Sequence, residues 1–138
     1  MSWPILHQAC ARGMPQSLKA LLTTELSDWK IPVTVGNHQA MSAAHLAACS
    51  NSVDCLAVLL DNAGPQIIDC VDGSLATPLH YSAGLGCTSV TDWLLDNGAC
   101  VNACDSAGAT PLLWAAGMTN HGFCESNQSQ LVQTLELF

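Results

Sequence analysis

The most constraining feature of this chain is a segment that recurs after 33 residues. Residues 72–84 read DGSLATPLHYSAG, and residues 105–117 read DSAGATPLLWAAG. A repeat of this length indicates a supersecondary unit that stacks on its neighbours, because one unit alone cannot bury its apolar face. The sequence therefore predicts a stack of repeated units, and it directs the search for function to surfaces rather than to active sites.

Four copies of the unit align on one recurring position, and the later copies are the most regular. Paired leucines follow the first three anchors at a constant offset. The copies cover about residues 1–36, 37–71, 72–104 and 105–138, which together predict a single domain over 1–138. The four anchors are His7, His45, His80 and Leu113.

Each unit is predicted to contain two helices and a finger. Thr77 places a capping hydroxyl before Pro78, and this proline fits the first turn of a helix. Apolar residues at helical spacing over 90–95 predict a second helix, which ends at Asn97-Gly98, a pair suited to positive φ. Residues 99–108 are polar and rich in turn formers, so they predict an extended, hairpin-like finger.

These motifs resemble the ankyrin repeat. The resemblance is carried by residues 105–112 (DSAGATPL) and 77–80 (TPLH), is closest over about 64–117, and covers nearly the whole chain. It implies an all-α solenoid of helix pairs with short β-hairpin-like fingers, in which the first and last of four repeats are atypical. Leu75 departs from the family pattern, which has glycine at this finger position, and Leu113 replaces the usual histidine.

The charge pattern excludes several classes of partner. The chain has 3 Lys and Arg residues against 11 Asp and Glu, and no Lys or Arg follows Lys30. Nucleic acids and anionic membrane surfaces both require cations, so we expect neither as a partner. No apolar run is long enough to span a bilayer, and the first residues lack the pattern of a signal peptide. We expect a cytoplasmic or nuclear protein, whose charge would attract a basic partner.

Patterns of catalytic residues are absent from the sequence. It has no phosphate-binding glycine loop with a lysine, no nucleophile elbow and no zinc-protease helix. The resemblance implies that the histidines at 7, 45 and 80 are structural. We therefore expect no enzyme activity and no cofactor.

The eight cysteines are expected to be reduced thiols, because the chain has ample apolar residues and no secretory signal. Cys10 and Cys55 fall at positions expected in the core. Cys70, Cys100 and Cys104 leave open a zinc- or redox-responsive regulator, although a structural zinc site usually needs two close pairs of ligands.

The ankyrin resemblance implies a module that binds a protein partner through its finger tips and inner-helix face. Met41, Leu85 and Met118 are expected to form an apolar stripe on this face. Tyr81 and Trp114 are expected in the core. The candidate partner-binding residues are His38, Gln39, Met41, Ser50, Ser74, Ala76, Leu85, Ser106, Ala107, Ala109 and Met118.

Several alternatives stay open at the level of the sequence. The acidic surface could make the chain an inhibitor or masking subunit for a basic partner segment. The stretches 25–37 and 120–130 interrupt the repeat period and could project from the stack. The apolar pair Leu137-Phe138 lacks a stop signal, which fits a truncated piece of a longer array or an edge used for self-association.

Overall fold

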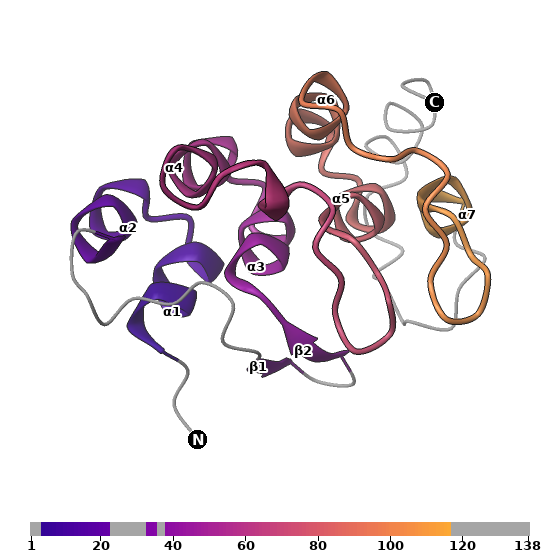
Figure 1. Cartoon of the computed structure of the whole chain (residues 1–138), viewed down its shortest axis with the longest axis horizontal. Helices are drawn as coiled ribbons and strands as arrows, with labels where there is room; N and C mark the ends of the chain where they lie inside the picture. Colours follow the sequence, from indigo (N-terminus) through magenta and orange to yellow (C-terminus); the bar gives the residue numbers. More distant parts are fainter. Residues whose placement is uncertain (1–3, 23–32, 36–37, 117–138) are drawn as a thin grey trace.

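The computed structural model describes residues 4–22, 33–35 and 38–116, in which helices predominate (Figure 1). These residues form seven α-helices, one short 3-10 helix and one two-stranded antiparallel sheet. The elements in chain order are α1 (Ile5–Ala11), α2 (Pro15–Leu22), β1 (Val33–Val35), β2 (His38–Met41), α3 (Ala43–Cys49), α4 (Val53–Ala63), η1 (Pro65–Ile67), α5 (Pro78–Leu85), α6 (Thr88–Asp96) and α7 (Pro111–Ala115).

The helices form two rows, as expected for stacked helix pairs. An inner row contains α1, α3, α5 and α7, and each of these helices packs against the next. An outer row contains α2, α4 and α6, of which each packs against its inner partner and its outer neighbour. Figure 1 shows the fingers on the side of the inner row that faces away from α4 and α6. The all-α solenoid predicted from the sequence is confirmed.

Local sequence signals set the ends of the helices. The hydroxyl of Thr77 accepts a hydrogen bond from the N–H of His80 at the start of α5, and Pro78 occupies the first turn. Thr110 accepts from the N–H of Leu113 in the same way at the start of α7. Gly98, at φ 85°, follows the end of α6. The capping prediction for Thr77 and the positive φ predicted near Asn97-Gly98 are both confirmed.

Small residues allow the inner helices to lie close together. Ala44, Ala47, Ala48 and Ala83 are all fully buried in the core that runs through the stack. Larger apolar side chains from the outer helices, such as Leu59 and Leu94, fill the space between the two rows. This burial follows the helical spacing of apolar residues in the sequence.

Three fingers lie beside the inner helices, and they differ in form. The first is a β-hairpin in which Val33 pairs with Met41 and Val35 with His38. The other two, here called the 72–76 finger and the 105–109 finger, are tight turns between the end of one repeat and the start of the next inner helix. The stretch 25–37 lies largely outside the described residues, as do the whole of 120–130 and the last apolar stretch.

Candidate binding surface

An aspartate at the base of each tight finger holds the shape of that finger. Asp72 Oδ1 accepts hydrogen bonds from the backbone N–H groups of Ser74 and Ala76, both at 2.9 Å. Asp105 Oδ1 accepts from the N–H groups of Ala107 at 2.9 Å and Ala109 at 2.8 Å. The repeated geometry means that the two finger tips are presented in the same conformation on neighbouring repeats.

The second carboxylate oxygen joins the finger to its inner helix. The Tyr81 hydroxyl of α5 donates to Asp72 Oδ2, and the Trp114 indole N–H of α7 donates to Asp105 Oδ2 at 3.0 Å. Burial by itself would raise the pKa of Asp105, but the hydrogen bonds from the Ala109 N–H and the indole outweigh burial and lower it. Both carboxylates are buried, so neither presents its oxygen atoms on the surface of the finger.

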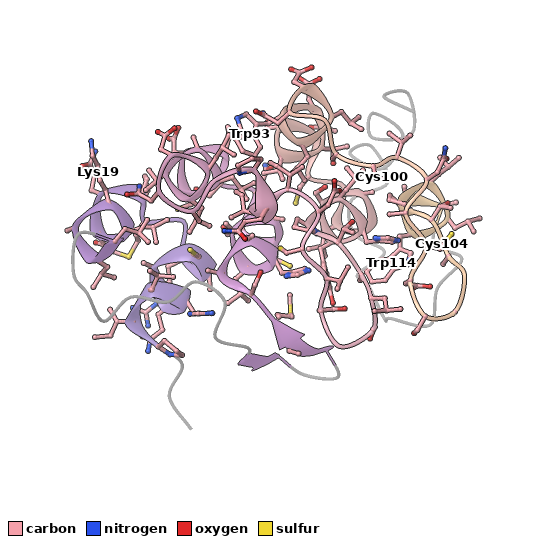
Figure 2. All side chains as sticks on the ribbon, viewed as in Figure 1. Lys19, Trp93, Cys100, Cys104 and Trp114 are labelled. Atoms are coloured by element: carbon pink, nitrogen blue, oxygen red, sulfur yellow. The ribbon has the colours of Figure 1, made fainter. Side chains whose placement is uncertain are left out.

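The aromatic rings behind the fingers form a continuous layer across the repeats. The ring centroids of Tyr81 and Trp114 lie 5.2 Å apart in an edge-to-face arrangement, and His45 meets Tyr81 at 5.5 Å. Both Tyr81 and Trp114 are buried, which confirms their expected place in the core. Figure 2 shows Trp114 on α7, behind the finger that leads into this helix.

One buried histidine connects each tight finger to the preceding repeat: His45 contacts the 72–76 finger, and His80 contacts the 105–109 finger. His80 Nδ1 accepts from the Thr77 N–H at 3.0 Å, and its Nε2 lies 2.9 Å from the carbonyl oxygen of Ala109. His45 makes the equivalent contacts with Ser42 and with the carbonyl oxygen of Ala76, which lies 2.8 Å from Nε2. This pattern assigns the Nε2-protonated neutral form to both rings. The structural role implied by the family resemblance is confirmed for His45 and His80, and His7 is likewise buried.

The structure exposes only some of the residues expected to bind a partner. Ser106 and Ala107 are exposed at the tip of the 105–109 finger, and Ser74 is half-buried at the tip of the 72–76 finger. The amide of Ser106 donates to the carbonyl oxygen of Ser74 at 2.8 Å, which ties the two tips together. Leu85 and Ala109 are half-buried and pack against the core.

Two of the expected surface residues are interior residues, and the expectation that they are accessible is wrong. Met41 is 1% exposed, because β2 turns its side chain into the core. Ala76 is fully buried, since its N–H bonds to Asp72 and its carbonyl oxygen receives His45. The expected stripe of Met41 with Leu85 and Met118 therefore lacks its first member.

Of the remaining candidates, the structure describes the side chain of Ser50 alone. The hydroxyl of Ser50, which is half-buried, donates to the carbonyl oxygens of Cys10 and Ala47 and so links two inner helices. His38 and Gln39 belong to β2, but their side chains lie outside the described part of the chain. Met118 lies outside the described residues as well.

Sequence reasoning did not include Leu75 and Val71 among the binding candidates, although both are about half exposed beside the finger tips. Leu75 has φ 61°, in the left-handed region, and the equivalent residue of the next finger is Gly108 at φ 80°. The signal that could have found Leu75 was its place at a finger position where the family has glycine. For Val71 the sequence carried no such signal.

Exposed carboxylates lie away from the fingers. The exposed acidic residues of the described ranges from 38 to 116 belong to the outer helices α4 and α6 and to the segment after η1. Figure 1 shows these helices on the opposite side of the inner row from the fingers. The residues are Asp54, Asp61, Asp69, Asp92 and Asp96.

The cysteines are divided between the core and the surface. Cys10 and Cys55 are buried, as expected, and burial raises the pKa of the half-buried Cys70 thiol to about 11. Cys100 and Cys104 are exposed on the segment between α6 and α7 (Figure 2). Across the described ranges, no three or more His, Cys, Asp or Glu side chains are grouped so that they could hold a metal ion. Nor is any helix of those ranges both long and apolar enough to cross a membrane.

Comparison with known proteins gives a consistent family. The ankyrin repeat model matches residues 75–106. The human B-cell lymphoma 3 protein is 34% identical over 115 residues, which is 80% of this chain and 24% of that protein. The human ankyrin repeat and SOCS box protein 16 is 31% identical over 132 residues, which is 95% of this chain and 28% of that protein.

A third relative carries the name of an enzyme. Rat diacylglycerol kinase zeta is 33% identical over 75 residues, which is 54% of this chain and only 8% of that protein. The chain thus spans less than a third of the length of each of these three relatives. Ankyrin-repeat proteins generally act as noncatalytic modules for protein–protein interaction. The repeated helix pairs and fingers, the matched repeat model and these relatives together identify the chain as a member of the ankyrin-repeat family.

Proposed function

We propose that this chain is an adaptor module that binds a protein partner through its finger tips and the adjoining inner helices α3, α5 and α7. The observation that carries this proposal is the difference in charge between the two sides of the stack. The outer helices α4 and α6 carry exposed carboxylates, whereas the finger tips carry none. The tips of the 72–76 and 105–109 fingers are exposed, uncharged and fixed by internal hydrogen bonds. A rigid surface loses little conformational entropy on binding, which favours affinity.

Crosslinking in native cells followed by mass spectrometry tests this proposal. We expect the crosslinked partner peptides to map to the fingers and to the inner helices. The reagent must be photoreactive and insert into C–H bonds, because no lysine follows residue 30 and the carboxylates of the fingers are buried. The control is the outer surface of α4 and α6. Crosslinks confined to those outer helices would contradict the proposed binding face.

A second candidate function is an inhibitor or masking subunit for a basic partner segment. It is supported by the exposed carboxylates of α4 and α6 and by the absence of Lys and Arg after residue 30. Such a partner would lie on the outer helices rather than on the fingers. Its affinity should decrease steeply as salt rises, and the D92K/D96K variant should weaken it further. Binding that is insensitive to salt would exclude this candidate.

We also propose self-association through the C-terminal edge of the stack. Val101 and Leu112 are 42% and 43% exposed, whereas Ile68 and Leu79, each 33 residues earlier in the sequence, are 3% and 0% exposed. Apolar positions that are buried one period earlier are thus exposed towards the C-terminal end of the described residues. Sedimentation velocity should detect a dimer that L112D disrupts, and a monomer at every accessible concentration would refute self-association.

The proposed cellular location is a reducing compartment, the cytoplasm or the nucleus. All the described cysteines are free, including the exposed Cys100 and Cys104. Exposed free thiols persist where the cell keeps thiols reduced. Imaging of the tagged protein in living cells tests this location, and a signal in the secretory pathway would contradict it.

A further inference from the structure

Leu75 combines two unfavourable properties at the tip of the 72–76 finger. Its backbone has φ 61°, where the Cβ atom of a leucine crowds the following carbonyl group. Its side chain is 51% exposed, so much of its apolar surface faces water. The next finger makes the same turn with Gly108, which adopts this backbone conformation at no such cost.

The fold itself does not require a leucine here. Asp72 holds its finger through the amides of Ser74 and Ala76, and Asp105 holds the next finger through the two equivalent amides. The hydrogen bonds that shape the turn are therefore the same with leucine or with glycine in place. Strained residues that a fold can do without are found most often at binding and catalytic sites.

The surroundings of Leu75 are apolar or neutral. Gly73, Ser106 and Ala107 are exposed beside it, and the hydrogen bond from Ser106 to Ser74 makes the two tips one continuous surface. Val71 adds a second half-exposed apolar side chain at the base of the finger. The only carboxylates of the two fingers, at positions 72 and 105, are turned inward. This surface therefore offers nothing that would attract a charged segment.

We infer that Leu75 is the anchor residue for an uncharged, apolar segment of the partner protein, which lies across the tips of the 72–76 and 105–109 fingers. This inference rests on the proposed function and specifies the chemistry of the bound segment. Charge complementarity selects this occupant, because a neutral surface gives an acidic or basic segment no compensation for the loss of its hydration. The outer helices, which carry the exposed carboxylates, would serve a basic segment instead.

The test uses a phage library of random dodecapeptides, selected on the whole chain. We expect the enriched peptides to be rich in apolar residues, and their affinity to change little with salt. In the L75G and L75N variants the affinity should fall by at least about tenfold, because a central apolar contact is removed. Both variants should fold, since glycine and asparagine tolerate positive φ. M14S is the matched control, because Met14 is 45% exposed, close to the 51% of Leu75, but lies between α1 and α2, away from both fingers.

Each outcome decides the inference. Peptides that bind L75G and L75N as tightly as the parent chain would overturn it, as would basic peptides that are released by salt or a selection that enriches no peptide. If neither variant folds, the inference is also wrong, because Leu75 would then be required for folding. Crosslinks from enriched peptides to the fingers without dependence on Leu75 would leave the proposed function standing, whereas crosslinks only to α4 and α6 would remove both.

Discussion

At the scale of single residues, the two finger aspartates explain how polar groups can be placed inside a small apolar stack. Each carboxylate satisfies two backbone amides and one aromatic donor, so no donor of the turn is left buried without an acceptor at that point. A buried charge is tolerated when it is hydrogen-bonded in this way. The residues Asp105 and Trp114 thus act as one unit that fixes the finger to α7.

Replacing Asp105 by alanine should destabilise the protein by about 3 kcal/mol, because the buried indole N–H of Trp114 and the two partly buried amides of the finger lose a charged acceptor. Urea unfolding followed by circular dichroism measures this change. D96A is the matched control, since Asp96 is exposed on α6, and it should change stability by no more than about 0.5 kcal/mol. Equal effects of the two substitutions would contradict the structural role of Asp105.

The buried histidines predict how stability depends on pH. Burial lowers the pKa of His45 and of His80 in the folded protein. Below about pH 6.5, the ordinary pKa of histidine, the unfolded chain therefore binds protons more readily than the folded chain. The free energy of unfolding should decrease as the pH falls below this value, by up to ~1.4 kcal/mol per pH unit for each ring.

The measurement is the urea midpoint between about pH 7.5 and about pH 5, a window that follows from the histidine pKa. The carboxylate of Asp105 does not contribute in this window, because its pKa is lowered. Replacement of His80 by glutamine should reduce the slope. A midpoint that stays constant over the whole range would contradict the neutral, buried state of the two rings.

At the scale of secondary-structure elements, α5 and α7 begin with the same Thr-Pro pair but differ in what the threonine holds. The hydroxyl of Thr77 contacts both the N–H and the Nδ1 atom of His80, whereas that of Thr110 caps only the N–H of Leu113. Because this chain has leucine at position 113, where α5 has His80, the hydroxyl that caps α7 lacks the ring partner that Thr77 has.

This difference predicts unequal costs for the two caps. T110A should cost about 1 kcal/mol, the usual loss for a helix cap. T77A should cost about twice as much, because the buried ring of His80 also loses its hydroxyl partner. Thermal or urea unfolding compares the two variants, and the serine variants T77S and T110S serve as controls that keep the hydroxyl. A larger cost for T110A than for T77A would refute this account of the caps.

At the scale of the whole molecule, the period of the sequence was enough to predict the solenoid, because the motif at 72–84 and its copy at 105–117 specify helix starts, turns and small core residues together. The caps at Thr77 and Thr110 follow from local chemistry, which a sequence shows directly. The binding surface could be predicted less well. The burial of Met41 depends on the pairing of β2 with β1, and the burial of Ala76 depends on a histidine from the preceding repeat.

Leu75 illustrates the limit of such reasoning from another direction. The sequence marks it as a departure from the family pattern, but its exposure and its left-handed backbone emerge only from the folded finger. The location of the acidic residues is a similar case. Their number is visible in the sequence, whereas the position of four of them on the outer helices, away from the fingers, depends on how the helix pairs stack; these are Asp54, Asp61, Asp92 and Asp96.

The central claim is that the partner binds the fingers rather than the outer helices. The most direct measurement uses the partner that crosslinking identifies. Calorimetry measures its affinity for two matched variants, each of which places one arginine at an exposed position. A107R lies at a finger tip and S89R on α6. We predict that A107R weakens binding by at least about tenfold, or ~1.4 kcal/mol, while S89R leaves it unchanged. Loss of binding in S89R with full binding in A107R would contradict the claim.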